Sequence, residues 1–208
     1  MCSIAKRNLI KNLVIGGDFF SQSQFSPFAN LVPPVTWAQE RDAARELLRH
    51  MLDVFENIWI VMGNHERRLV KWADATLDEK DVFGMVITSN RVHVNKFAYC
   101  TLETSAGKWR VTHPANYRQA RGQTPALLAD KLRMNVIAGH EHHTAMTYSP
   151  SGEFVAVSIG GLYDAGKIAY VQLTDQLRPA MTPGFVMLRG GYPYLFGDKL
   201  TNWEAWGA

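Results

Sequence analysis

Four stretches of the chain carry side chains that could bind a metal ion, and each stretch follows a short apolar run. These stretches contain Asp18, Asn64 with His65, His113, and His140 with His142. Carboxylate, amide and imidazole groups are ligands of intermediate hardness, and they suit Mn, Fe, Zn or Ni rather than Ca. The residue types therefore predict a site for a divalent transition metal.

The apolar runs ahead of these residues predict buried strands of a mostly parallel sheet. They are short and rich in β-branched residues: Leu13–Ile15, Ile58–Met62, Trp109–Thr112 and Asn135–Ala138. Three of the four are followed directly by Gly, which allows the chain to turn sharply after the strand. Ligand sites of open α/β sheets lie at the carboxyl ends of their strands, so the four stretches are expected to converge there.

The residue types also indicate which reaction such a site would catalyse. Two metal ions roughly 3.5–4 Å apart can clamp a phosphoryl group and lower the pKa of a bridging water. Asp18 can bridge two ions, and Asn64 can bind through its amide oxygen. His140 and His142 could bind one ion each or both bind the same ion. His65, beside a ligand, could donate a proton to the leaving alkoxide or stabilise the equatorial oxygens.

The motifs resemble those of calcineurin-like metallophosphoesterases. Four of that family's five motifs are present in the family's order, each after an apolar strand: Gly17-Asp18, Gly63-Asn64-His65-Glu66, His113, and Gly139-His140-x-His142. The resemblance covers the chain from about Leu13 to about Leu173, and the short chain is similar to small phage and bacterial members. It implies a β-sandwich of mixed sheets flanked by helices.

The resemblance also implies a role for each matched residue. In that family the residue matching Asp18 bridges two metal ions, and the residue matching His142 serves one of them. The residues matching Asn64, His113 and His140 complete the other metal site. The histidine matching His65 is the catalytic one. A metal-dependent phosphoesterase with two ions, such as manganese, is therefore the expected enzyme, and its expected substrate is a phosphate ester such as a nucleotide or nucleic acid.

The family's first motif, Asp-x-His on the first strand, has no counterpart, because nothing before Asp18 is Asp or His. We therefore expect the first strand to be missing and Met1 to be an internal start. One metal site keeps four candidate ligands, whereas the other keeps only His142 and the shared Asp18. A catalytically impaired remnant that binds at most one metal is thus one alternative function. A nucleic-acid-binding module without chemistry is another.

The rest of the chain predicts one domain, residues 1–208, with a core at about 13–173 and a C-terminal extension at 174–208. Phe19–Pro34 is expected to be a loop with exposed aromatics beside the site. Three helices are expected, each with an apolar face: one opened by the capping box Thr36-x-x-Gln39 (Trp37, Ala44, Leu48, Met51, Leu52, Phe55), Arg67–Ala75 (Leu69, Val70, Trp72) and Thr124–Met134 (Leu127, Leu128, Leu132).

Further strands are predicted from alternation and turn residues. Phe97–Thr104 and Trp109–Thr112 are expected to form a hairpin, and the remaining strands are Arg91–Asn95, Ala145–Tyr148, Phe154–Ser158, Ile168–Leu173 and Gly184–Leu188. The first half of the chain is therefore expected to be α/β and the second increasingly β. The rest of the tail is expected to wrap the surface.

Several other polar residues have simpler interpretations. His143 and His93 are expected to be structural, and Glu66 to support the ligands from behind or to sit at a helix N-terminus. Arg67 and Arg118 are weaker candidates for substrate binding, since basic runs usually form a solvated helix face. Cys100 is expected in the core.

Bulk properties exclude several protein classes. Hydrophobic residues make up 47% and charged residues 20% of the chain, which is typical of a globular protein. The net charge of +3 is too small to predict nucleic-acid binding by itself. No apolar run approaches the roughly 20 residues that cross a bilayer, so no membrane partner is expected. Two well-separated cysteines favour a reducing compartment, and a cytoplasmic location is expected.

Overall fold

The computed structural model describes residues 1–26, 29–31, 35–74, 76–164 and 181–206. The chain divides into two compact units: unit 1 comprises Met1–Ala98 and Trp203–Ala208, and unit 2 comprises Tyr99–Asn202. Each unit combines a β-sheet with helices. The predicted mixed α/β class, with sheets flanked by helices, is therefore confirmed. That the whole chain forms one domain stays a prediction.

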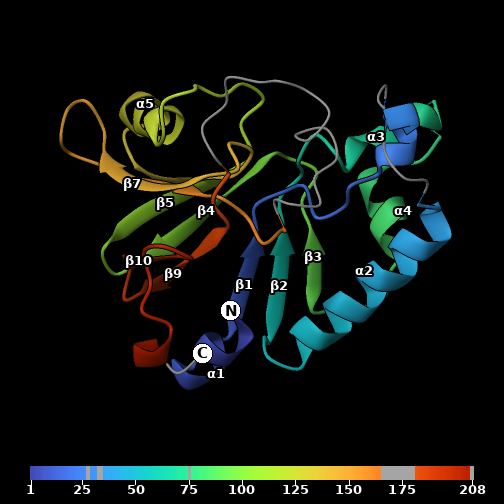
Figure 1. Ribbon diagram of the computed structural model, residues 1–208, viewed down its shortest axis with the longest axis horizontal. Helices are drawn as coiled ribbons and strands as arrows, with labels where there is room; N and C mark the ends of the chain where they lie inside the picture. Colours follow the sequence, from blue (N-terminus) through green and yellow to red (C-terminus); the bar gives the residue numbers. More distant parts are fainter. Residues whose placement is uncertain (27–28, 32–34, 75, 165–180, 207–208) are drawn as a thin grey trace. The chain divides into compact units, whose positions relative to one another are not determined.

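Unit 1 contains a three-stranded parallel sheet in the order β1-β2-β3 (Figure 1). Two of the four apolar runs that were predicted to share one sheet, Leu13–Ile15 and Ile58–Met62, lie in it, and the other two lie in the sheet of unit 2. The strands are β1 (Asn12–Ile15), β2 (Asn57–Ile60) and β3 (Val92–Val94). Its helices are α1 (Cys2–Arg7), α2 (Trp37–Leu52), α3 (Arg67–Trp72) and α4 (Glu79–Gly84), with single 3-10 turns at Ser23–Phe25, Ala29–Leu31 and Glu204–Trp206. Because β1 and β2 are parallel neighbours, the loops that follow them leave the same edge of the sheet.

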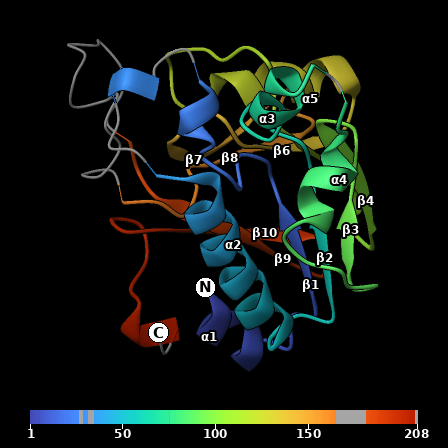
Figure 2. The same ribbon diagram turned by 90° about the vertical axis from the view of Figure 1, so that its right-hand side faces the viewer.

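Helix α2 begins where the sequence predicts. The Thr36 hydroxyl accepts a hydrogen bond from the Gln39 backbone N–H (3.3 Å), and the Gln39 side-chain oxygen accepts one from the Thr36 N–H (2.9 Å). This reciprocal pair satisfies donors that a helix start leaves open. The predicted inner face is buried at Ala44, Leu48 and Met51. Figure 2 shows α2 running across one face of the β1–β3 sheet.

The loop after β1 differs from its predicted exposure. Phe20 is only 2% exposed, and its ring contacts those of Phe83 (4.9 Å between centroids) and Trp37 (5.6 Å). An aromatic ring next to a polar strand end gains free energy by burial in an adjacent core. Residues 27, 28 and 32–34 of the predicted loop lie outside the described residues.

Helix α3 ends earlier than predicted, and one of its three predicted inner-face residues is exposed. Leu69 is 5% exposed, as expected, but Trp72 is 70% exposed. The Trp72 ring lies beside that of Phe25, which is itself partly buried, with 5.3 Å between the ring centroids. Placing Trp72 on the inner face was therefore wrong. A six-residue helix completes fewer than two turns, so periodicity fixes few of its positions. Ala75, its predicted end, lies outside the described residues.

Unit 2 contains a five-stranded mixed sheet in the order β4-β5-β6-β8-β7. Strands β5 (Gly107–Thr112), β6 (Asn135–Ala138) and β8 (Val155–Ile159) are parallel to one another. The edge strands, β4 (Tyr99–Thr104) and β7 (Thr144–Tyr148), run antiparallel to β5 and β8. The predicted hairpin between β4 and β5 is confirmed, and His113 and Gly139 follow two adjacent parallel strands.

Helix α5 (Gln123–Leu132) packs on β6 and β8, and Ala126 and Ala129 are its buried apolar contacts. Leu128 and Leu132 pack partly against this cluster, whereas Leu127 is 40% exposed, so its predicted inward position was wrong. Small residues at the centre of the buried face allow the helix to approach the sheet closely. The short alanines therefore determine the contact, and the larger leucines flank it.

The C-terminal segment of unit 2 forms an antiparallel hairpin of β9 (Gly184–Arg189) and β10 (Tyr192–Gly197). The strand predicted at Gly184–Leu188 is confirmed, but β10 corrects the expectation that the rest of the tail only wraps the surface. The Trp109 indole N–H donates to the Gly191 carbonyl (3.0 Å), which anchors the hairpin turn on β5. The strand predicted at Ile168–Leu173 lies outside the described residues.

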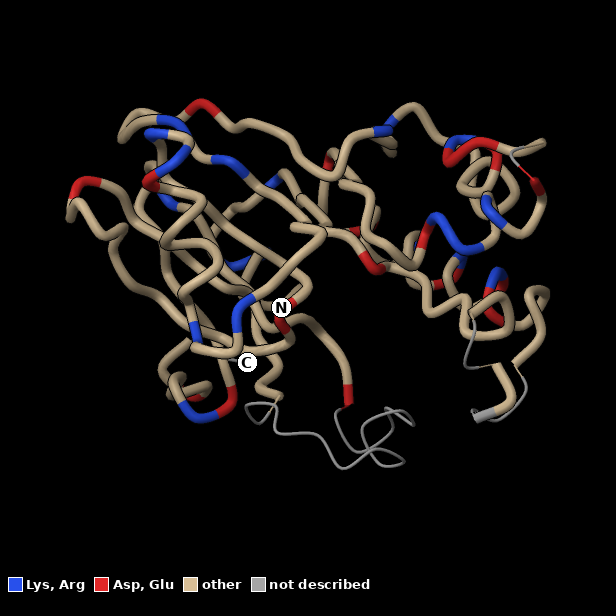
Figure 3. The backbone as a smooth tube through the Cα atoms, turned by 90° about the horizontal axis from the view of Figure 1, so that it is seen from above, with Lys and Arg blue, Asp and Glu red and all other residues tan. Residues whose placement is uncertain are grey.

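Along the backbone of both units, Lys and Arg positions are interspersed among Asp and Glu positions (Figure 3). Among the helices that the structure describes, none has the length and apolar character needed to cross a bilayer. Cys100, predicted in the core, is half-buried on edge strand β4. Burial raises the pKa of its thiol, and the nearby Arg110 charge lowers it to a smaller extent.

Candidate functional site

Two loops meet at the carboxyl edge of the unit 1 sheet. The loop after β1 carries Asp18, and the loop after β2 carries Gly63-Asn64-His65-Glu66. The His65 backbone N–H donates to Asp18 Oδ1 (3.0 Å), and His65 Nε2 lies 3.8 Å from Asp18 Oδ2. The structure therefore brings these two predicted site segments together, as their positions after adjacent parallel strands require.

Glu66 holds the two loops to each other. Its side chain is fully buried: Oε2 accepts hydrogen bonds from the backbone N–H groups of Gly63 (2.8 Å) and Asp18 (3.0 Å), and Oε1 accepts one from Phe20 (3.1 Å). Burial, followed by the nearby Asp18 charge, raises the pKa of the Glu66 carboxyl, although the three backbone donors oppose this shift. Both expectations for Glu66 fit the structure, because it supports the two loops through these contacts and is also the N-cap residue of α3.

Gly63 permits this close approach. A Cβ atom at Gly63 would collide with Asp18 and press against the Glu66 carboxylate (2.8 Å). Asp18 itself has a left-handed backbone, with φ of 54°. Strained backbone of this kind persists where surrounding contacts enforce it, and it concentrates at functional sites. The contacts with Gly63 and Glu66 are such enforcing contacts.

Arg67, a weaker candidate for substrate binding, interacts with two groups of unit 1. Its Nη2 donates to the Lys96 carbonyl (3.3 Å), and its Nε lies 3.5 Å from Glu79 Oε1. The next residue, Arg68, donates from Nη1 to the Ser21 carbonyl (2.7 Å). The basic run at the start of α3 therefore makes specific contacts within unit 1. That Arg67 binds substrate stays a prediction.

In unit 2, two predicted metal ligands lie at the ends of adjacent strands β5 and β6. His113 Nε2 and His140 Nδ1 are 3.0 Å apart, and His113 is only 5% exposed. Two imidazole nitrogens on one tetrahedral zinc-like ion would be about 3.3 Å apart, given metal–nitrogen bonds of about 2.0–2.1 Å. The spacing and chemistry of this pair therefore fit a shared divalent transition metal.

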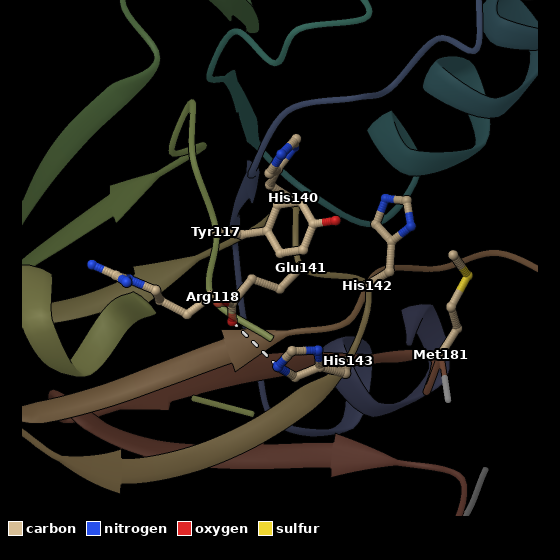
Figure 4. Close-up of a pocket in the computed structure, with 7 residues that line it drawn as sticks. All are labelled: Tyr117, Arg118, His140, Glu141, His142, His143 and Met181. Atoms are coloured by element: carbon tan, nitrogen blue, oxygen red, sulfur yellow. Dashed lines mark ion pairs between the residues drawn. The ribbon is translucent and has the colours of Figure 1, made fainter. Parts of the chain in front are cut away.

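The loop from His140 to His143 lines a small pocket (Figure 4). His140 and His142 line the pocket together with Tyr117, Arg118 and Met181. Both histidines have left-handed backbones, with φ of 76° and 59°. The His142 carbonyl is held by the Thr182 N–H (3.0 Å) and by the Tyr163 hydroxyl (2.5 Å). Unit 2 therefore directs both predicted ligands into one pocket.

Glu141 and His143 form a buried pair that the sequence analysis missed. His143 Nε2 lies 3.3 Å from Glu141 Oε2, and the two side chains are 3% and 0% exposed. Burial raises the pKa of the Glu141 carboxyl, but His143 and the Thr124 and Ser158 hydroxyls lower it more, so the net shift is downward. The pair anchors the loop that carries the two ligands. The only signal in the sequence is a glutamate between two histidines.

His143, expected to be structural, has that role, since the Gly122 N–H also approaches its Nε2 (3.4 Å). His93 stacks on Trp59, with 5.0 Å between ring centroids, and its Nε2 lies 3.3 Å from Asn57 Oδ1, which again fits a structural role. Arg118 lines the pocket, and its backbone N–H donates to the Thr124 hydroxyl (2.8 Å). Arg118 therefore lies close to the predicted ligands of unit 2.

Three solved structures are similar to this chain at low identity. A single mutant of Vps29 from Entamoeba histolytica has 17% identity and a TM-score of 0.41, covering 88% of this chain and 91% of that chain. Wild-type Vps29 from the same organism, complexed with Zn²⁺, has 14% identity and a TM-score of 0.38, covering 88% and 90%. Vacuolar protein sorting 29 from Cryptosporidium parvum has 18% identity and a TM-score of 0.38, covering 74% and 75%. No protein-family model matches the chain, and no curated protein does.

Proposed function

We propose that the chain is a metal-dependent phosphoesterase that hydrolyses a phosphomonoester or a phosphodiester. The observation that carries the proposal is the His113–His140 pair, whose ring nitrogens lie 3.0 Å apart at adjacent strand ends. Two imidazoles at this spacing fit one divalent transition-metal ion. The order of the metallophosphoesterase-like motifs along the chain supports the same chemistry, and it favours a phosphate ester, including a nucleotide or nucleic acid, as substrate.

The proposed ligands come from both units. His113 and His140 would hold one ion with Asp18 and Asn64, and His142 would serve a second ion that shares Asp18. Bound ions of this kind polarise a phosphoryl group and lower the pKa of a coordinated water. Manganese is the ion that we would test first.

His65 is the proposed proton donor to the leaving oxygen. Its ring faces the Asp18 carboxylate at 3.8 Å, so a phosphate ester held beside Asp18 would come within reach of the ring. Arg118, on the pocket wall, is proposed to contact the substrate. Arg67 could do so only by exchanging its contacts with Lys96 and Glu79.

Kinship with small phage and bacterial enzymes and a cytoplasmic location complete the proposal. The cytoplasmic location rests on the low cysteine content, with only Cys2 and Cys100 in the chain.

The test is Mn²⁺-dependent hydrolysis of bis(p-nitrophenyl) phosphate and p-nitrophenyl phosphate. Asn64→Ala and His140→Ala each remove a proposed ligand from a different unit. Each is expected to lower turnover at least about 100-fold, since even residues that only support a ligand cost 10- to 100-fold. His50→Ala, at an exposed position in the last turn of α2, is the matched histidine control and should retain activity.

Metal content distinguishes the proposal from the one-ion alternative. The metal-loaded chain should bind two equivalents of Mn²⁺ and turn over both esters or one of them. Folded, metal-loaded protein that hydrolyses neither ester would overturn the proposal, and a single equivalent bound without turnover would favour the impaired remnant. Turnover that survives both ligand substitutions would also contradict it.

A further inference from the structure

The segment Asp18–Gln22, which follows β1, is held by side-chain carboxylates at four backbone N–H groups. At the start of the segment, the Glu66 carboxylate accepts hydrogen bonds from the N–H groups of Asp18 and Phe20. At its other end the Glu40 carboxylate, from helix α2, accepts the N–H groups of Ser21 (2.6 Å) and Gln22 (2.9 Å). Two carboxylates, from two different helical segments, therefore fix the path of this loop.

One peptide plane within this loop connects Glu40 to His65. The Ser21 N–H and the Phe20 carbonyl belong to the same peptide unit, which is planar and rigid, so its N–H and C=O point in opposite directions. The N–H donates to Glu40 Oε1, and the carbonyl oxygen lies 3.2 Å from His65 Nδ1. The orientation that Glu40 imposes on the N–H therefore also sets the direction of the carbonyl.

The Phe20 carbonyl in turn selects the chemistry of the His65 ring. A carbonyl oxygen only accepts hydrogen bonds, so this contact requires a proton on Nδ1. Nε2, which lies 3.8 Å from Asp18 Oδ2, is then the nitrogen that gives up or receives a proton on the Asp18 side. The Glu40 carboxylate also polarises the Phe20–Ser21 peptide, which strengthens the hydrogen bond from His65 Nδ1 to the Phe20 carbonyl.

We propose that Glu40 is a positioning residue for His65: through the Phe20–Ser21 peptide it fixes the ring orientation and directs Nε2 toward the site. This inference rests on the proposed function, in which His65 protonates the leaving oxygen. Glu40 does not touch the substrate, and its effect is confined to the proton-transfer step. Protonation matters most when the leaving group is a poor one, because a good leaving group departs without it.

The test compares two phosphate monoesters with different leaving groups, p-nitrophenyl phosphate and phenyl phosphate, in the Mn²⁺-loaded full chain. Glu40→Gln keeps the size of the side chain but removes its charge, and it turns an amide N–H₂ toward the Gln22 N–H and the Gln24 amide, whose hydrogen bonds Oε2 accepts (3.2 Å each). Its hold on the Ser21 N–H is therefore weaker. We expect turnover of phenyl phosphate to fall about 10-fold more than turnover of p-nitrophenyl phosphate, a fraction of the 10²–10⁴ that a full general acid contributes. His65→Asn gives the reference for complete loss.

The ratio of the two turnover numbers does not depend on the fraction of folded protein, so simple destabilisation leaves it unchanged. Glu46→Gln, at an exposed position of the same helix, is the matched control and should also leave the ratio unchanged. Should Glu40→Gln fail to fold, Glu40→Asp serves instead. It keeps the charge but withdraws the carboxylate from the Ser21 N–H, and it is expected to change the ratio in the same direction.

A second readout needs no turnover. In metal-free protein labelled with ¹⁵N-histidine, the His65 ring nitrogens should have the shifts of the Nδ1–H tautomer, and Glu40→Gln should mix the tautomers. An unchanged ratio and unchanged shifts in both Glu40 variants of an active enzyme would overturn the inference alone. A wild-type chain that binds metal and hydrolyses neither these monoesters nor bis(p-nitrophenyl) phosphate would overturn the proposed function, and this inference with it.

Discussion

Each unit has a buried glutamate beside its predicted ligands, but the two glutamates are stabilised in different ways. Glu66, next to His65 in unit 1, accepts three backbone N–H groups from two loops. Glu141, between His140 and His142 in unit 2, faces the imidazole of His143 instead. The first carboxylate is held by neutral dipoles of the main chain, and the second by a side chain that can carry a positive charge.

This difference explains why their pKa values shift in opposite directions. For Glu66, burial and the Asp18 charge outweigh the backbone donors and raise the pKa. For Glu141, His143 and two hydroxyls outweigh burial and lower it. The comparison teaches that a buried glutamate beside a site can connect loops without a counter-ion, or it can form half of a charge pair. Sequence does not distinguish these two cases.

The largest effect is expected from removing the partner of Glu141. His143→Ala leaves a buried carboxylate without its imidazole, and breaking a buried pair in this way costs about 3–5 kcal/mol of unfolding free energy. Urea denaturation followed by Trp109 fluorescence measures the loss in unit 2. Adding Glu141→Gln should recover part of it, because no buried charge then remains, and a double variant as unstable as the single one would contradict the pairing.

Glu66→Gln should cost less, about 1–3 kcal/mol, because one amide hydrogen must then face a backbone donor in a buried position. Urea denaturation followed by Trp59 fluorescence reports on unit 1, with exposed Glu46→Gln as the control. No single side-chain substitution should rescue this variant, since its partners are backbone groups. A cost equal to that of the control would show that the three hydrogen bonds to Glu66 contribute nothing to the free energy of unfolding.

The pH dependence should have opposite signs in the two units. The pKa of Glu141 is lower in the folded chain than its ordinary value of 4.5. Its contribution to the free energy of unfolding is therefore fully present above pH 4.5, and it is lost as the pH falls through the folded pKa. A raised folded pKa makes the contribution of Glu66 present below 4.5 and lost as the pH rises through the folded pKa. Comparing wild-type chain with Glu141→Gln below about pH 4.5 and with Glu66→Gln above it measures both, and parallel trends would refute the contrast.

The smallest effects are expected at the two positions whose burial the sequence misplaced. Trp72→Gln in unit 1 and Leu127→Gln in unit 2 should each change the unfolding free energy by only about 0.5 kcal/mol, as exposed sites usually do. Leu69→Ala, on the same helix as Trp72 but 5% exposed, should cost about 2–5 kcal/mol. Thermal unfolding of the three variants ranks them, and a Trp72 cost near that of Leu69 would contradict the exposed ring.

The sequence was sufficient where one short-range rule determined the structure. Thr36 and Gln39 are three residues apart, so their capping box could be predicted from the sequence alone. The glycines after the apolar runs likewise predicted the strand ends, and these ends bring Asp18 near His65 and His113 near His140. Local chemistry and strand order fixed these features together.

The sequence was insufficient where a contact joins distant segments. Nothing near Glu40 indicates that it holds the Ser21 N–H, and nothing near His143 indicates its contact with Gly122. Phe20 was predicted to be exposed in a loop. Its burial depends on Phe83, which lies far along the chain, so the residues around Phe20 do not reveal it. Such features follow from tertiary packing, which periodicity and motif spacing do not encode.

The left-handed backbone at Asp18, His140 and His142 restricts which substitutions each position can accept. Asn and Gly enter this region of φ and ψ at little cost, whereas a β-branched residue would force the loop to move. A library of variants should therefore retain Asn and Gly at these positions and lose Val, Ile and Thr, even when only folding is selected. Asp18→Asn and His140→Asn are consequently the preferred inactive variants for trapping a bound substrate, because neither should disturb its loop.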